Sequence, residues 1–387
     1  MAQLLGTELF HFCKRCFKMK KLAIIGASYL QKPLVLKAKE MGIETHCFAW
    51  EEGAVCKDIA DFFYPISITE KNLILKKCEE IGIDGITSIA SDLASPTMCY
   101  VAEKMGLIGN SYSVALVAAN KYLMRKCFAD KNVNSPRFII ANENYSLKNF
   151  KFPLIVKPTD RSGSRGVMKI KHAEEIEQAV KRAKNESFSG EVIIEEFISG
   201  DEVSVETISW EGKHYILAIT DKVTSGEPYF VELEHHQPSM LPSEIQLKIK
   251  NLTIKALKAL DITYGASHSE FKITENGEVF VIEVGARMGG DFIGSDLVQL
   301  STGYDFLKGL IELSLGKFSE PVLKEKKNSG IYFLTKETEK VKPYIEQSAL
   351  YPEIVRAEIT DSEIRPAQSS TDRSGYFIYR SDKRMEI

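Results

Sequence analysis

The chain lacks the features that would place it in a membrane or on nucleic acid. Its apolar runs fall well short of the roughly 20 residues that a membrane-spanning helix needs, and its N-terminus has neither the apolar segment nor the small-residue cleavage site of a signal peptide. The formal net charge is only -3, so no overall basic surface favours a nucleic-acid partner. The composition therefore predicts a cytoplasmic protein that acts on small molecules, with neither nucleic acid nor a membrane as partner.

The cysteines lack any pairing pattern. There are seven of them, an odd number at irregular spacings, which favours reduced thiols in the cytosol over a disulfide framework. Cys13 and Cys16 form a CxxC with His11 just before it, but no second pair of ligands completes a zinc site. Residues 1–18 also have no clear helix or strand pattern, so we predict that they are a disordered extension or a misassigned start.

Most of the remaining chain alternates short apolar strands with helices. With 387 residues, 44% of them hydrophobic, the chain is long enough for two or three domains. Up to about residue 112 the order strand, helix, strand repeats, which predicts a parallel sheet with helices on both faces. The loop 26–28 after the first strand lacks the G-x-G-x-x-G of dinucleotide sites. Ser91 and Asp92 end a later strand, where they either contact a substrate or cap the next helix.

A loop rich in glycine, serine and arginine follows a buried strand that ends near Lys157. In this loop, residues 159–167, glycines and hydroxyls let backbone N–H groups approach phosphate oxygens, and Arg161 and Arg165 add positive charge. The Walker pattern is absent, so the loop is not a P-loop. We predict that it binds phosphate; the alternative is a plain flexible turn. A helical segment over residues 113–130 precedes this region.

The segment 191–206 is an apolar strand that stops at two acids, Glu195 and Glu196, and resumes after a glycine. Such a linker can present backbone groups to the edge of a planar base, and an acid just beyond it can accept hydrogen bonds from ribose hydroxyls. The alternative is an exposed bend between strands. Further along, His235 and His236 fall in a predicted loop, where one of them contacts substrate or, as the pattern favours, both lie on the surface.

Two carboxylates occupy matching positions on a predicted β-hairpin. Glu270 and Glu283 lie in two alternating segments that are joined by the turn residues 275–277, ENG. On paired antiparallel strands both side chains can point to one face, where hard oxygen ligands favour Mg²⁺ beside phosphate. Arg287 follows directly and can neutralise an anionic ligand. The alternative is a solvated hairpin with ordinary surface glutamates.

Together these features resemble the ATP-grasp superfamily over roughly residues 121–291, and within it the carboxylate-amine ligases, such as amino-acid ligases and carbamoyl-phosphate-synthase-like members. The resemblance implies an α/β and α+β ATP-grasp fold. Its parts would be an N-terminal parallel-sheet βαβ domain at 19–112, a central ATP-binding domain at 113–315 with a lid at about 121–195, and a small C-terminal α+β lobe at 316–387.

The resemblance also assigns roles by position. The implied ATP-binding residues are Lys121, Lys157, Ser162, Gly163, Ser164, Gly166, Glu195, Glu196, Phe197, Ile198 and Glu202; the metal ligands are Glu270 and Glu283; the catalytic residues are Lys157 and Arg287. The implied cofactors are ATP and Mg²⁺, with Mn²⁺ as an alternative metal. Many members carry an asparagine two positions after the second glutamate, whereas this chain has Gly285, which offers no side-chain ligand.

The implied reaction joins a small-molecule carboxylate to an amine through an acyl-phosphate and releases ADP and phosphate. Two alternatives remain at this point: an enzyme that phosphorylates or carboxylates a small metabolite, and a nucleotide-binding regulator without turnover. A homodimer is expected from the resemblance. In the last part of the chain, Arg373 either reaches the active site or forms a surface salt bridge.

Overall fold

The computed structural model describes residues 19–142 and 145–387. The predictions for residues 1–18, including the CxxC, lie outside the described residues. Within the described ranges, no helix has both the length and the apolar character to cross a membrane.

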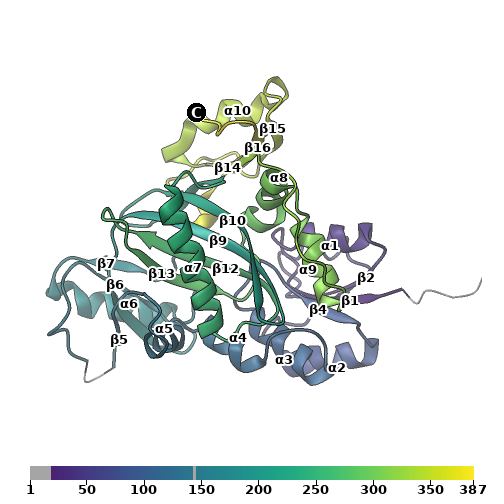
Figure 1. Cartoon of the computed structure of the whole chain (residues 1–387), viewed down its shortest axis with the longest axis horizontal. Coiled ribbons are helices and arrows are strands. Elements are labelled where there is room, and N and C mark those ends of the chain that lie inside the picture. Colours follow the sequence, from purple (N-terminus) through teal and green to yellow (C-terminus); the bar gives the residue numbers. More distant parts are fainter. Residues whose placement is uncertain (1–18, 143–144) are drawn as a thin grey trace, which may run out of the picture.

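The N-terminal part is a parallel sheet between helices. Its strands are β1 (Lys21–Ile25), β2 (Glu44–Phe48), β3 (Phe62–Tyr64) and β4 (Gly85–Thr87), in the order β3-β2-β1-β4. Helix α1 (Lys32–Glu40) lies on one side of the sheet, and α2 (Lys71–Ile81) and α3 (Ser95–Met105) lie on the other (Figure 1). The chain order reverses at β1, so the carboxyl ends of β1 and β4 border the crevice where such sheets bind ligands.

A helical hairpin leads into the next part. The predicted helix over 113–130 is two helices, α4 (Tyr112–Ala119) and α5 (Lys121–Asp130). Asn120 separates them because its backbone is extended and its side chain accepts a hydrogen bond from the Leu123 amide, which makes it the N-cap of α5. This cap places Lys121 at the first position of α5.

A small antiparallel sheet follows, with the strand order β5-β8-β6-β7. Its strands are β5 (Phe138–Ile140), β6 (Leu154–Pro158), β7 (Met168–Ile170) and β8 (Val192–Glu196). Helix α6 (Ile176–Glu186), which begins after a short 3₁₀ turn (Ala173–Glu175), packs its apolar face on this sheet. The loop between β6 and β7 is the predicted phosphate-binding loop.

The largest element is an eight-stranded antiparallel sheet in the order β13-β12-β9-β10-β11-β14-β16-β15. Its first five strands are β13 (Val279–Gly285), β12 (Gly265–Ile273), β9 (Asp201–Trp210), β10 (Lys213–Thr224) and β11 (Glu232–Gln237). Helix α7 (Ser243–Ala259) packs on β13 and β10. His235 and His236 lie in β11 and are 1% and 3% exposed, so the prediction that they are surface residues in a loop was wrong.

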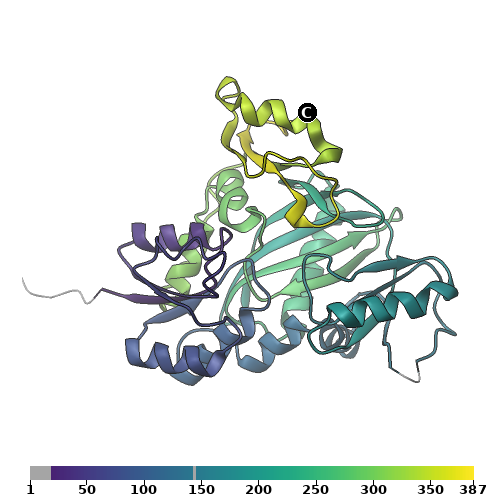
Figure 2. The ribbon, with the colours of Figure 1, turned by 180° about the vertical axis from the view of Figure 1, so that it is seen from behind.

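The C-terminal strands continue this sheet. They are β14 (Asn328–Leu334), β15 (Ile354–Ile359) and β16 (Gly375–Ser381), with the short helix α10 (Lys342–Glu346) and three 3₁₀ turns (Lys336–Val341, Ser348–Leu350 and Ser370–Asp372) around them. Because β14 pairs with β11, the last part of the chain extends the central sheet, at the top of the molecule in Figures 1 and 2.

One hydrophobic core joins the N-terminal part to the central sheet. After β13 the chain forms a π-helical turn (Ile293–Leu297), α8 (Val298–Thr302) and α9 (Phe306–Ser314). Helix α9 packs against α1 and β4, and its buried side chains share a cluster with β1 and with Ile208 of β9. This shared core fixes the carboxyl ends of β1 and β4 beside the site described next.

Candidate active site

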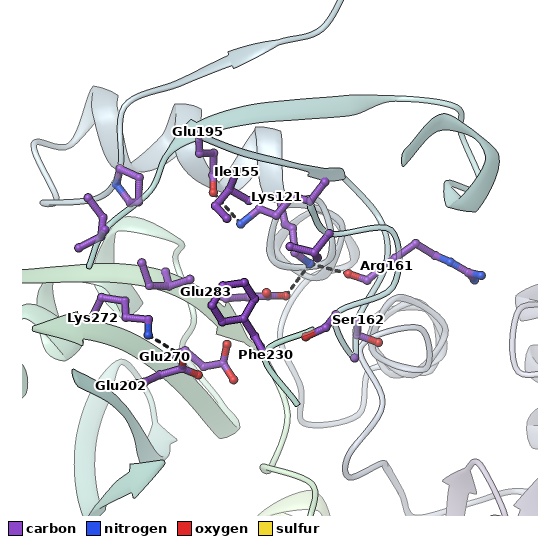
Figure 3. A pocket seen from close by; sticks show the side chains of 18 of the residues that line it. Lys121, Ile155, Arg161, Ser162, Glu195, Glu202, Phe230, Glu270, Lys272 and Glu283 are labelled. Atoms are coloured by element: carbon purple, nitrogen blue, oxygen red, sulfur yellow. Dashed lines mark hydrogen bonds and ion pairs between the residues drawn. The ribbon is translucent and has the colours of Figure 1, made fainter. Parts of the chain in front are cut away.

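A cavity of about 220 Å³ lies between the small sheet and the central sheet, and it collects nearly all the predicted site residues (Figure 3). The predicted residues that line it are Lys121, Lys157, Ser162, Gly163, Ser164, Glu195, Glu196, Phe197, Ile198, Glu202, Glu270, Glu283 and Arg287. Gly166 does not line it; this glycine has a φ of +70° beside Pro158 and Glu186 and shapes the end of the loop.

The two predicted metal ligands face each other across the hairpin. Glu270 of β12 pairs in register with Glu283 of β13, and a bulge follows Glu270. Glu283 contacts the Lys121 ammonium at 2.8 Å, and Glu270 contacts the Lys222 ammonium at 2.7 Å. Burial alone would raise the pKa of Glu270, but the charges of Lys222 and His268 hold it well below its usual range. Both carboxylates line the cavity and offer oxygen donors, which is the donor set that Mg²⁺ takes, so the residues fit the metal.

Two buried lysines also line the cavity. Lys121 donates to Glu283 and also to the carbonyl of Arg161 at 2.7 Å, so it connects α5, the hairpin and the glycine-rich loop. Lys157 of β6 contacts Glu195 at 2.6 Å. Burial lowers the pKa of Lys157 despite this carboxylate. Burial also opposes the charged form of Lys121, but Glu283, with Asp92 and Glu270, outweighs it and raises the pKa of Lys121.

Glu195 is held from both sides by cations. Besides Lys157, it contacts Arg125 of α5, whose Nε lies 2.7 Å from Oε1 and whose side chain is fully buried. The cations lower the pKa of Glu195 against the effect of burial. Arg125 was missed in the sequence analysis, because a helical arginine is normally solvated and nothing local indicates that it faces inward.

The predicted adenine linker runs from the end of β8 to the start of β9. Gly200 makes the reversal possible: its φ is +138°, and a Cβ there would lie 1.8 Å from the carbonyl oxygen of Ile273. The reversal places Glu202 at the start of β9, where it contacts Lys222 at 2.8 Å and Lys272 at 3.1 Å. Phe197 of the linker lies under the ammonium of Lys169, 3.6 Å from the ring centre.

Lys222 of β10 is a second functional candidate that the sequence analysis missed. Its ammonium lies 2.8, 3.4 and 2.7 Å from the carboxylates of Glu202, Glu232 and Glu270. One carboxylate oxygen of each of these three acids lies within 4.8 Å of the other two. Burial opposes the charged form of Lys222, but the charges of the three acids hold its pKa well above the usual value. The acids come from three strands distant in sequence, so only the strand register brings them together.

The position of Gly285 explains why no asparagine stands there. Arg287 forms a two-point ion pair with Asp92, with Nε–Oδ1 at 2.9 Å and Nη2–Oδ2 at 2.8 Å. A Cβ on residue 285 would lie 2.7 Å from Oδ1 of Asp92 and 3.2 Å from Nε of Arg287. The ion pair therefore fills the space that a side chain at 285 would need. Asp92 links the N-terminal part to Arg287 and also lines the cavity, so the substrate contact that was one of its two expected roles stays a prediction.

Arg373 also lies next to the cavity. Its side chain is 7% exposed and contacts Asp291 at 2.8 Å and Glu232, a cavity residue, at 3.3 Å. Of the two alternatives for Arg373, the surface salt bridge is therefore wrong, and Arg373 reaches the cavity through Glu232. The buried His235 lies 3.6 Å from the same Asp291.

Comparison with known proteins identifies the class of this site. Residues 150–296 match the model of the ATP-grasp domain, so the chain carries an ATP-grasp domain and the predicted fold is confirmed. The chain is 29% identical over 321 residues to an alanine--anticapsin ligase of Bacillus subtilis (strain 168), covering 70% of this chain and 67% of the relative. It is 29% identical over 211 residues to a D-alanine--D-alanine ligase of Christiangramia forsetii, covering 53% and 60%.

A solved structure extends the likeness to nearly the whole chain. The L-amino acid ligase from Bacillus licheniformis superimposes with a TM-score of 0.78 over 94% of both chains at 24% identity, which shows a common fold. The predicted ATP-grasp fold is thus confirmed, and the two sequence relatives named above are ligases, whereas the roles of single residues stay predictions.

Proposed function

We propose that the protein is an ATP-dependent ligase that joins a small-molecule carboxylate to an amine through an acyl-phosphate and releases ADP and phosphate. The observation that carries the proposal is the single cavity in which two facing carboxylates, Glu270 and Glu283, lie beside Lys121, Lys157 and Arg287. The relatives named above are ligases, which supports the reaction class.

The cavity suggests how ATP is held. Ile155, Ile198 and Ile282 give it an apolar end beside the linker, which suits the adenine ring. Glu202 lies next to that end and would accept hydrogen bonds from the ribose. The phosphates would then reach the two lysines and the loop with Ser162.

We assign Glu270 and Glu283 as the ligands of Mg²⁺, with Mn²⁺ as an alternative. When bound, the metal would supply positive charge to the phosphate oxygens. Both acids line the cavity, and the ammonium groups of Lys121 and Lys222 that contact them would turn to the phosphates. Gly285 contributes no ligand, and its neighbour Asp92 is committed to Arg287.

The reaction needs positioning and charge more than a protein nucleophile. An oxygen of the carboxylate attacks the γ-phosphorus, and the bond from phosphorus to the ADP oxygen breaks. The amine then attacks the acyl carbon, the bond from carbon to the phosphate oxygen breaks, and the amine loses a proton. Arg287, with its fixed guanidinium, would stabilise the transferring phosphate. The glycine-rich loop would limit hydrolysis of the acyl-phosphate by excluding water.

The test is release of ADP by the purified chain with acids and amines supplied separately and together. We expect amide formation, with stoichiometric ADP and phosphate, only when both are present. Turnover with bicarbonate alone would contradict the proposal and favour a carboxylating enzyme, and nucleotide binding without turnover would favour a regulator. Glu283→Gln should abolish turnover, whereas Glu275→Gln, an exposed residue in the turn of the same hairpin, should not. We also propose that the enzyme acts in the cytoplasm. We further propose that it is a homodimer, and sedimentation of the purified chain would check this oligomeric state.

A further inference from the structure

A second cavity opens at one end of the ATP cavity. Its volume is about 680 Å³, within the range of roughly 300–1,000 Å³ that small-molecule sites occupy. The residues that line both cavities are Asp92, Lys121, Arg161, Ser162 and Glu283. None of the linker residues or Glu202 lines the second cavity. The second cavity therefore adjoins the end of the ATP site where Lys121 and Glu283 lie, which is the end assigned to the phosphates.

The outer wall of this second cavity is apolar. Trp50, on the loop after β2, is 51% exposed, and Phe188, on the loop after α6, is 63% exposed. Leu93, Pro96 and Ala119 add to this apolar wall, and Thr69 also lines the cavity. Large apolar side chains that line a cavity and remain this exposed offer surface to an apolar ligand group. The wall is built from the N-terminal sheet on one side and the lid region on the other.

The lid side of the wall is held in place by polar contacts. Asp160 accepts hydrogen bonds from the backbone amides of Phe188 and Ser189, at 3.2 and 2.8 Å, and from the Ser187 hydroxyl. The guanidinium of Arg161 stacks over the Phe188 ring at 4.1 Å. The Phe188 ring is therefore positioned at the cavity by groups that belong to the predicted phosphate-binding loop and its flanks.

The charges at the inner end suit a carboxylate. Asp92 and Glu283 are each paired, with Arg287 and Lys121, and Asp160 is occupied by its hydrogen bonds. Arg165, by contrast, has no ion-pair partner among the described residues and lies on the wall of this cavity. An acid bound here would direct its carboxylate toward Lys121 and the phosphate end and its side chain toward Trp50.

We propose that this second cavity, here called the acid cavity, binds the carboxylate substrate and selects an acid with a bulky apolar or aromatic side chain, and that Trp50, Leu93 and Phe188 determine this selectivity. The inference rests on the proposed ligase function and adds the class of acid to it. A small acid such as glycine would leave the apolar wall uncovered and would bind weakly.

The test measures acid activation alone, with hydroxylamine in place of the amine, so that the acyl-phosphate is trapped as a hydroxamate. Probe acids are glycine, alanine, leucine and phenylalanine, together with acetate, 4-methylpentanoate and 3-phenylpropanoate. We expect kcat/KM to rise with side-chain size in both series. Trp50→Ala should raise KM for the largest acids by at least about tenfold and leave KM for ATP and for glycine unchanged.

Two variants control for general damage. Trp50→Phe keeps an aromatic ring in the wall and should retain most of the selectivity, whereas Leu247→Ala, a 58% exposed residue on α7 outside both cavities, should change nothing. The inference is overturned if the unaltered enzyme prefers the small acids, or if Trp50→Ala changes KM for the amine instead of the acid. If no acid gives a hydroxamate, the proposed ligase function fails as well.

A binding measurement gives a readout that does not depend on turnover. The chain has two tryptophans, and Trp210 packs on Phe318 away from both cavities. In Trp210→Phe the fluorescence reports Trp50 alone. We expect 3-phenylpropanoate to change this fluorescence in the presence of a non-hydrolysable ATP analogue, and acetate to leave it unchanged. Equal responses to both acids would contradict the proposed selectivity.

Discussion

Gly285→Asn would place a side chain where the family resemblance implies a metal ligand, and we expect it to damage the enzyme. The new Cβ would lie 2.7 Å from Asp92 Oδ1 and 3.2 Å from Arg287 Nε, whereas ordinary van der Waals contacts of a Cβ begin at 3.4 Å. The ion pair must therefore shift by roughly 0.7 Å or separate.

The size of the effect follows from that shift. Overpacking of this kind costs about 1–3 kcal/mol of folding free energy. A displacement near 1 Å of a group that positions the reacting atoms costs about a hundredfold in rate, which corresponds to about 2.7 kcal/mol of transition-state stabilisation. We therefore expect kcat to fall about a hundredfold while KM for ATP changes little, because Glu202 and the linker are untouched.

The assay combines urea denaturation with steady-state ADP release. Gly290→Ala is the control for stability, because a Cβ there meets its nearest neighbour, the Cβ of Ala90, at 3.4 Å. In an Asp92→Ala background the obstructing carboxylate is gone, so Gly285→Asn should cost less stability than it does in the unaltered chain. The reasoning is refuted if Gly285→Asn leaves stability intact and increases Mn²⁺ affinity or turnover, since the site would then have room for an amide ligand.

Three further predictions concern the groups around the cavity. Glu195→Gln leaves two buried cations unpaired and should lower the free energy of unfolding by roughly 3–5 kcal/mol, whereas Glu196→Gln, whose partner Arg137 is exposed, should have almost no effect; urea denaturation compares them. Burial lowers the pKa of His235 below the ordinary 6.5, so the unfolded chain takes up this proton first and stability falls as the pH drops below 6.5; thermal melting from pH 5 to 8 should show a weaker slope in His235→Gln, and an unchanged slope would contradict the assignment. Gly200→Ala should greatly weaken ATP binding and stability, because its Cβ would overlap a carbonyl oxygen, whereas Gly212→Ala, with φ at +77° and open space, should cost only about 1 kcal/mol; similar losses in the two variants would show that backbone strain alone decides.

The parts of the site that could be predicted are those that depend only on residues close together in the sequence. The turn before β13 follows from Asn276 and Gly277, the latter at φ +74°, and two alternating segments around it fix Glu270 opposite Glu283. The break between α4 and α5 at Asn120 also has a local signal, because asparagine is a common helix N-cap. It was missed because the apolar pattern on both sides of Asn120 favoured one continuous helix.

The parts that could not be predicted depend on strand register and on distant partners. The sequence of β11, ELEHHQ, has no apolar alternation, and it is a strand because β10 and β14 pair with it on both sides. The same pairing buries His235. Lys222 and Arg125 are ordinary cations in their own segments, and their acids are brought to them only by the folded sheet and by α5 packed beside it.

The contact among Asp92, Gly285 and Arg287 has a consequence for how these positions evolve. Residue 92 lies in the loop after β4, whereas residue 285 ends β13 and residue 287 follows it almost two hundred positions later, yet one substitution changes which residues the other two positions can hold. We expect these three columns to vary together among related sequences, so that an asparagine at 285 accompanies the loss of the acid at 92. An alignment read at these positions would divide the related chains into two groups: those in which an acid of the N-terminal part forms an ion pair with the arginine, and those in which it does not.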